Sequence, residues 1–207
     1  MAFGTADCQR IRHSAFGIRH CPGFTVIEQL FVLAIIAIVI AISIPEMLSG
    51  LDEARTRMAA RYVAGEMYRT RAQAVMRSTR VACRFLFDGE EYAFGSFADG
   101  NANGVRAADI ASGVDRRLTA DIRLSALFGQ VRFAIGPGVP LIDGGAGADP
   151  IRISSGSLLT FSPIGSASGG SLYIRGARGA QYAVRVFGVT GRTRVFRYLP
   201  GAGWKLQ

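Results

Sequence analysis

The chain has 207 residues, of which 49% are hydrophobic and 19% are charged. This composition excludes a wholly disordered chain and allows one globular domain with an appendage. The 24 basic and 15 acidic residues give a formal charge of +9, which suits an anionic partner such as nucleic acid or a membrane surface but does not determine a fold.

The first 23 residues hold both histidines and two of the three cysteines, at Cys8, His13, His20 and Cys21. Without this segment the chain would carry 21 basic and 14 acidic residues, or +7, and its single cysteine would be Cys83. Such a chain has no imidazole for general-base catalysis or zinc binding, and it cannot form an internal disulfide. We therefore expect a protein that is not an enzyme and that needs no cofactor.

The segment from Phe24 to Ile44 holds 21 residues with one charge, and residues 30–42 are apolar throughout. A helix of that length spans about 30 Å of hydrocarbon at about 1.5 Å per residue. A secretory signal peptide would have a shorter apolar region followed by a small-residue cleavage site, whereas Pro45 and Glu46 follow here. The segment therefore predicts a transmembrane helix, and the arginines on both sides of it leave its orientation open.

Glu28 is the one charged residue in this segment. A carboxylate costs about 2.5 to 3.5 kcal/mol at the centre of a membrane and less near its edge. Two interpretations stay open on the residues alone. Glu28 lies at the level of the headgroups, or it pairs with a positive group of a neighbouring subunit once the helix enters a protein bundle.

Residues 21–28 read Cys-Pro-Gly-Phe-Thr-Val-Ile-Glu, which resembles the cleavage and methylation motif of type IV prepilins and type II secretion pseudopilins. The resemblance implies that prepilin peptidase cuts between Gly23 and Phe24 on the cytoplasmic face and that Phe24 becomes N-methylated. It also implies that the Glu28 carboxylate meets the N-terminal amine of an adjacent subunit during assembly. Pro45 falls where pilins commonly have a helix-kinking proline.

The same resemblance implies a cytoplasmic N-terminus and a periplasmic head. The expected location is the bacterial inner membrane, as a single-pass protein, and a filament after assembly. The expected partners are other pilins or pseudopilins, prepilin peptidase as the processing enzyme, the inner membrane and, in the alternative function below, double-stranded DNA.

After Pro45, apolar or small residues recur at steps of three or four and define one helical face. They are Met47, Leu51, Ala54, Met58, Tyr62, Gly65, Tyr68, Ala72 and Val75. The spacing predicts that the helix continues to about Arg80 and that this face packs on the head, with contacts to neighbouring subunits as a further use. Pro45 lacks a backbone N–H, so it should kink or loosen the helix, or else divide it into two helices.

Strand-like runs follow at residues 81–87 and 90–97, and Asp88-Gly89 would join them in a tight hairpin turn. Further β-type runs at 121–127, 130–135, 157–161, 171–174, 181–187 and 192–198 predict antiparallel structure. Glycine-rich stretches at 136–147 and 165–170 predict loops. Alternation directs Cys83, Phe85 and Phe87 inward, with the Cys83 thiol as a small buried hydrophobe.

A short loop places oxygen-bearing side chains at Asp99, Asn101 and Asn103, like the opening of a calcium-binding loop. Its twelfth position is Ile110, and Asp109 lies one residue short of the closing carboxylate. We therefore favour an Asx-rich turn over a calcium site and expect no bound metal.

Residues 158–198 resemble the closing region of the GspH/FimT family of minor pseudopilins: a strand, a Pro and Gly loop, two further strands, and a Gly-Arg pair that opens the last strand. The resemblance implies a head of two β-sheets packed beside the long helix. It also implies a minor pseudopilin of a type II secretion system, incorporated at or near the tip of the periplasmic pseudopilus and supporting protein secretion.

The expected fold class is therefore α+β and pilin-like, with a long N-terminal helix packed on an antiparallel β-sheet head. The helix should be transmembrane in its first half and amphipathic in its second. The expected boundaries are a cleaved leader at 1–23, the helix at 24–80 with its transmembrane segment at 24–44, and a periplasmic head at 81–207.

The alternative function is implied by the FimT branch, in which a C-terminal Gly-Arg-x-Arg motif captures DNA for uptake. Here the motif occupies residues 191–194. The candidate phosphate contacts are Arg178, Arg185, Arg192, Arg194 and Arg197. Alternation places Arg192 and Arg194 on one face of a strand and Arg197 on the other, and an ordinary solvated sheet face would have the same composition.

Overall fold

The structure is a computed structural model that describes residues 24–145, 147–154 and 156–207. The proposed leader, with Gly23 at its end, lies outside the described residues. The described chain divides into two compact units, with the division between Ser43 and Ile44. Helix α1 (Val26–Arg77) begins in the first unit and continues into the second.

Helix α1 ends at Arg77, three residues before the expected end at Arg80. Ser78 adopts a left-handed conformation with a φ of 51°, and the Thr79 N–H donates to the Ala74 carbonyl at 3.3 Å. This arrangement caps the last carbonyls of the helix in the way that a glycine usually does. The chain then turns directly into the first strand.

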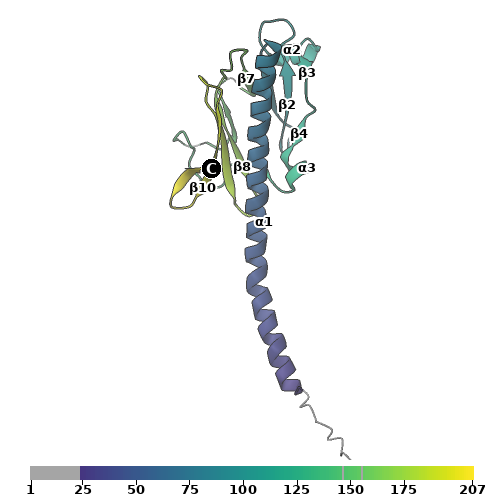
Figure 1. The fold of residues 1–207 in the computed structure, drawn as a ribbon, viewed down its shortest axis with the longest axis vertical. Helices are drawn as coiled ribbons and strands as arrows, with labels where there is room; N and C mark the ends of the chain where they lie inside the picture. Colours follow the sequence, from purple (N-terminus) through teal and green to yellow (C-terminus); the bar gives the residue numbers. More distant parts are fainter. Residues whose placement is uncertain (1–23, 146, 155) are drawn as a thin grey trace, which may run out of the picture. The chain divides into compact units, whose positions relative to one another are not determined.

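Two antiparallel sheets form the head (Figure 1). The first sheet has the order β3-β2-β1-β7, with β4 also paired to β2. Its strands are β1 (Val81–Phe87), β2 (Tyr92–Ala98), β3 (Arg116–Arg117), β4 (Ile122–Arg123) and β7 (Leu158–Phe161). The second sheet has the order β11-β10-β9-β8-β5, with β6 also paired to β8. Its strands are β5 (Arg132–Phe133), β6 (Ile151–Ile153), β8 (Gly170–Arg175), β9 (Gln181–Val186), β10 (Thr193–Leu199) and β11 (Gly203–Leu206).

The main core joins α1 to both sheets. Its buried side chains include Met67 of α1, Phe85 and Phe161 of the first sheet, and Leu172 and Tyr182 of the second. Figure 1 shows the strands of the two sheets on either side of the second half of α1. The predicted α+β, pilin-like fold class, with a long helix packed on antiparallel strands, is confirmed.

Most predicted strands of the head are present. The run at 81–87 coincides with β1, and the runs at 157–161, 171–174, 181–187 and 192–198 match β7, β8, β9 and β10 within one residue at each end. The strand predicted at 121–127 is present only as β4 at its start, because its second half belongs to helix α3 (Leu124–Phe128). Leu124 and Phe128 are four residues apart, so a helical turn directs both toward the core. Sequence reasoning also missed β3, β6, β11 and helix α2 (Ala107–Ser112).

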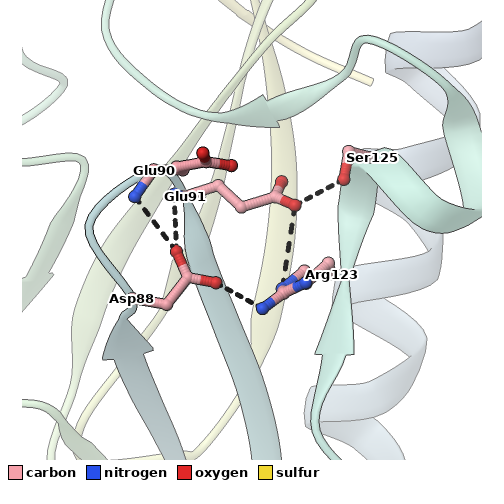
Figure 2. Close-up of polar contacts among 5 residues, drawn as sticks. All are labelled: Asp88, Glu90, Glu91, Arg123 and Ser125. Atoms are coloured by element: carbon pink, nitrogen blue, oxygen red, sulfur yellow. Dashed lines mark hydrogen bonds and ion pairs between the residues drawn. The ribbon is translucent and has the colours of Figure 1, made fainter.

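The connection between β1 and β2 is longer than the two-residue turn predicted from Asp88-Gly89. It takes in residues 88–91, and Gly89 has a φ of 104°. One carboxylate oxygen of Asp88 accepts the N–H of Glu91 at 3.0 Å and that of Glu90 at 3.1 Å (Figure 2). These two backbone hydrogen bonds favour the ionised carboxylate and lower the pKa of Asp88.

The same turn is tied to two later elements of the chain, β4 and α3 (Figure 2). The second carboxylate oxygen of Asp88 pairs with Arg123 of β4 at 2.5 Å. Glu91 accepts the hydroxyl of Ser125 at 2.6 Å and lies 3.8 Å from the Arg123 Nε atom. Asp88 and Glu91 of the hairpin thus bind Arg123 of β4 and Ser125 of α3. These contacts hold β4 and α3 against the hairpin.

Cys83 and Phe85 are buried as predicted, whereas Phe87 is 58% exposed. The reason is that β7 pairs only with residues 81–84, so the end of β1 extends beyond the core. Burial raises the pKa of the Cys83 thiol and keeps it neutral.

Asp52 of α1 holds the turn between β8 and β9. It is the first buried residue of the helix, and its carboxylate accepts the N–H of Arg178 at 3.0 Å and that of Ala180 at 3.4 Å. A Cβ atom on Gly176 in this turn would lie 2.5 and 2.6 Å from the two carboxylate oxygens of Asp52. The turn approaches the helix this closely because residue 176 has no side chain.

We expect Gly176→Ala to lower the free energy of unfolding by about 1 to 3 kcal/mol, because the added methyl group has no room. Denaturant unfolding of the detergent-solubilised chain, followed by the fluorescence of its single tryptophan, Trp204, measures this. Gly65→Ala is the control, because that helical site has open space and the change should stabilise by about 0.5 to 1 kcal/mol. Similar effects of the two substitutions would contradict the close approach.

Candidate functional site

The N-terminal half of α1 is apolar and uncovered. Every residue from Phe24 to Leu51 is exposed, and among the described residues α1 is the one helix long and apolar enough to cross a membrane. A continuous apolar surface of this size marks contact with lipid or with other proteins. The helix is therefore compatible with the transmembrane segment predicted at 24–44.

Glu28 lies in the first turn of α1, where a negative charge suits the positive end of the helix dipole. Its backbone N–H donates to the Thr25 hydroxyl at 3.3 Å. Its side chain is exposed and forms no ion pair within the described residues. Its pairing with the amine of another subunit and the cut before Phe24 stay predictions, since Gly23 lies outside the described residues.

Helix α1 continues through Pro45, so the alternative of two separate helices is wrong. Proline has no N–H to donate to the carbonyl four residues earlier, so the helix lacks one hydrogen bond at this point. The Ser49 hydroxyl donates to the Pro45 carbonyl at 3.0 Å, and the Ser43 hydroxyl donates to the Val39 carbonyl at 2.7 Å.

The face of α1 that was predicted to pack on the head is mostly exposed, and its contacts with the head include Tyr62, which packs on Phe128 of α3, and the Tyr68 hydroxyl, which donates to the Thr193 carbonyl at 2.7 Å. Met47, Met58, Tyr68 and Val75 of that face are each about half exposed or more. The buried face is nearly opposite and consists mostly of small or polar side chains. They are Asp52, Thr56, Ala59, Ala60, Val63, Ala64, Glu66, Met67, Thr70 and Ala74. Most large side chains of the core come from the sheets instead, and much of the apolar stripe is left exposed within the described residues.

The structure separates the arginines that were predicted to contact DNA. Arg197 lies on the inner face of the second sheet, where its Nε atom pairs with Glu53 of α1 at 2.9 Å. The Tyr182 hydroxyl donates to the same carboxylate oxygen. Arg178 lies in the turn between β8 and β9. Arg197 therefore links the sheet to the helix and does not share a surface with the Gly-Arg-x-Arg motif.

The pKa of Tyr182 is raised from 10.0 to about 12, first because burial disfavours the phenolate and then because Glu53 accepts its hydrogen bond and carries a negative charge. The native chain therefore keeps this proton to a higher pH than the unfolded chain does. The resulting stability is complete below pH 10 and is lost as the pH rises from about 10 to about 12. Tyr182→Phe should flatten this loss, as measured by denaturant unfolding at several pH values in that interval. The same slope in both proteins would contradict the role of Tyr182.

Arg185 and Arg194 lie directly opposite each other on β9 and β10. Ser171 on β8 lies opposite Arg185, and Arg152 on β6 lies opposite Ser171. Neighbouring strands are about 4.8 Å apart, so three arginines form a row across the outer face of the second sheet. Arg192 is exposed and directly precedes β10, two residues before Arg194, so we group it with this row. We call this set the outer arginine row.

Arg185 is partly neutralised, because it pairs with Asp143. Its guanidinium also lies 5.4 Å from the ring centroid of Phe187, which is 37% exposed. The other arginines of the outer arginine row form no ion pair within the described residues: Arg152, Arg192 and Arg194. This face therefore offers positive charge beside an exposed aromatic ring.

Arg152 and Phe187 were missed as candidate residues. Arg152 stands between Ile151 and Ile153, and this alternation of apolar and charged residues is typical of a half-buried strand. That pattern would have predicted β6 with its arginine facing out. The position of β6 beside β8 could not be read from the pattern.

The loop at Asp99 forms Asx turns. One Asp99 oxygen accepts the N–H of Asn101 at 3.1 Å, the other accepts that of Gly104 at 2.7 Å, and the Asn101 side chain accepts the N–H of Asn103 at 3.3 Å. The described residues hold no group of three or more His, Cys, Asp or Glu side chains placed to bind a metal ion. The expectation of no bound metal stays a prediction.

No family model matches the chain, and no curated protein matches it. Among solved structures it is similar to the minor pseudopilin EpsH from the Type 2 Secretion System of Vibrio cholerae. The identity is 12%, the TM-score is 0.44, and the match covers 71% of this chain and 98% of that chain. A likeness at this TM-score adds no argument about function, so the role of the chain has to be inferred from its own residues.

Proposed function

We propose that the chain is a pilin-type filament subunit, held in the inner membrane by residues 24–44 and later packed among the helices of other pilins. The observation that carries this proposal is the exposure of α1, which is apolar and uncovered up to Ile44 and keeps exposed apolar side chains beyond it at Met47, Leu51 and Met58. Water is a poor solvent for such a surface. Lipid would cover it before assembly, and neighbouring helices would cover it afterwards.

The finer proposal is a minor pseudopilin of the GspH/FimT type that works at or near the tip of a type II secretion pseudopilus and supports protein secretion. Two resemblances support it, the prepilin motif at residues 21–28 and the closing region at residues 158–198. In this proposal prepilin peptidase removes residues 1–23 and Phe24 is N-methylated. The role is mechanical, so it requires neither an enzymatic reaction nor a cofactor.

Fractionation of cells that also make prepilin peptidase and the other pseudopilins tests this proposal. The chain should be an integral inner-membrane protein, its head should be cut by protease added to the periplasm, and it should copurify with the other pseudopilins. A soluble periplasmic protein, or a head protected from the protease, would contradict the proposal.

A second function, capture of double-stranded DNA, is favoured by the outer arginine row. Its unpaired guanidinium groups and the nearby Phe187 ring combine charge with an aromatic surface, as proteins that bind nucleic acid commonly do. Backbone contacts of this kind would bind DNA without sequence preference and with strong salt dependence.

We expect the double substitution of Arg192 and Arg194 by Ala to weaken DNA binding and to lower the slope of log affinity against log salt by about two units, if each residue contacts one phosphate. Fluorescence anisotropy with a labelled duplex at several salt concentrations measures both. Substitution of Arg55 and Arg57 by Ala is the control, because it removes the same charge from exposed positions of α1. Equal losses would indicate generic attraction, and no binding at about 50 mM salt would leave only the filament role.

A further inference from the structure

A basic pocket lies where α1 enters the head. Its volume is about 530 Å³, and it is bordered by the β8–β9 turn, the loop at residues 136–139 and the part of α1 that begins at Ser49. Five charged residues line it: Asp52, Glu53, Arg175, Arg178 and Arg197.

Both carboxylates of the pocket are engaged within the protein. Asp52 accepts backbone N–H groups of the β8–β9 turn, and Glu53 pairs with Arg197 at 2.9 Å. The three arginines and two carboxylates of the pocket sum to +1, and Arg175 and Arg178 are its two guanidinium groups without an ion pair among the described residues.

The Arg175 Nε atom is buried and has no hydrogen-bond partner within the described residues. An unpaired buried donor is costly, so an acceptor that reached this atom would be bound favourably. The wall beside it is fixed by Gln181, whose side chain accepts the Gly136 N–H at 2.9 Å and donates to the carbonyls of Ala134 and Ile174, each at 3.1 Å. The pocket is thus preformed.

The pocket is close to the apolar segment along one helix. Ser49 is five residues and Glu53 nine residues beyond Ile44, or about 8 to 14 Å along the axis. The headgroup layer of a bilayer is on the order of 5 to 8 Å thick on each side, and long arginine side chains extend toward it. This step rests on the proposed membrane anchoring.

We propose that this pocket binds the phosphate of an anionic phospholipid from the leaflet that borders the head, with Arg175 and Arg178 as its ligands. Guanidinium groups donate paired hydrogen bonds to phosphate oxygens. Inorganic phosphate shares this chemistry, but the acyl chains of a lipid would remain beside the apolar part of α1. Lipid binding would hold the head against the membrane until the subunit leaves for the filament.

Native mass spectrometry of the full chain, released from detergent micelles and titrated with dioleoyl phosphatidylglycerol, dioleoyl phosphatidylcholine or sodium phosphate, tests the proposal. We expect phosphatidylglycerol to bind well above phosphatidylcholine. Arg175→Gln with Arg178→Gln should weaken phosphatidylglycerol binding on the order of 10- to 30-fold. Arg55→Gln with Arg57→Gln, the same charge change outside the pocket, should have an effect of less than about threefold.

Arg178→Gln alone keeps the backbone hydrogen bond to Asp52, so it tests the charge without disturbing the turn, and it should show part of the loss. Equal binding of the two lipids, or equal losses from the two arginine pairs, would overturn the proposal. If sodium phosphate binds with the same affinity as the lipid and displaces it, the site binds free phosphate, and the proposed lipid ligand is wrong. A chain that binds phosphatidylglycerol but does not assemble would contradict only the filament role. A chain that assembles without preferring phosphatidylglycerol would contradict only the proposed lipid binding by the pocket.

Discussion

Glu28→Ala is expected to reduce incorporation into filaments on the order of tenfold or more while leaving membrane insertion intact or improved. The substitution removes the cost of placing a carboxylate in an apolar segment, so insertion should not suffer. It also removes the charge proposed to pair with the Phe24 amine of an adjacent subunit, and a buried amine left without its partner is strongly unfavourable. Glu28→Ala should therefore impair filament incorporation without impairing membrane insertion.

The amount of chain in isolated filaments, relative to the amount in the membrane, measures this separation. Glu46→Ala is a matched control, because Glu46 is also an exposed glutamate of α1 and lies just beyond the apolar segment. Normal incorporation of the Glu28→Ala chain would refute the pairing, and equal losses in both variants would assign the effect to charge in general.

Gly23→Ala is expected to block processing, so that the full-length chain accumulates in the membrane. The resemblance to prepilins implies a peptidase that requires a minimal side chain before the cut, and the methyl group of alanine would occupy that space. Because the Phe24 amine would then never form, assembly should fail together with cleavage.

Gel mobility and intact mass of the membrane fraction, in a host with prepilin peptidase, measure the processed share. Gly17→Ala changes another glycine of the same leader and should be cut normally. Cleavage of the Gly23→Ala chain at the wild-type extent would rule out Gly23 as the residue recognised before the cut.

The strands that could be predicted are those whose own residues have the hydrophobic and β-branched or aromatic composition of a strand. In β1, the run from Val81 to Phe87 is apolar and β-branched or aromatic enough to identify the strand, and β9 and β10 show the same kind of run. The missed β6 has only three residues and is held by pairing with β8. The second half of the strand predicted at 121–127 shows the opposite case, since burial of Leu124 and Phe128 favours a helical turn there.

The orientation of α1 could not be predicted from its own pattern. Its large apolar side chains, such as Met58 and Tyr68, define the conspicuous stripe, but the sheets pack on the small residues around Ala60 and Val63. Large residues of the sheets fill the space that small residues of the helix leave, and this complementarity is visible only when the elements are placed together. Much of the conspicuous stripe then remains for a partner outside the described residues.

The candidate arginines illustrate the same limit. Alternation correctly placed Arg197 on the other face of β10 from Arg194, whereas Arg192 precedes the strand. It could not indicate that Glu53, far away in the sequence, would pair with Arg197, or that Arg152 would lie in line with Arg194. Pairing between distant strands decides which charges share a surface.

Tandem mass spectrometry of the N-terminal peptide tests the central proposal most directly. It is applied to the wild-type chain after expression with prepilin peptidase and isolation from the inner membrane. The proposal predicts a mature chain that begins at Phe24, carries one methyl group on its amine and retains the whole of α1. A chain in which Phe24 stays an unmodified internal residue, or one cut after Ile44 so that the apolar segment is lost, would contradict it.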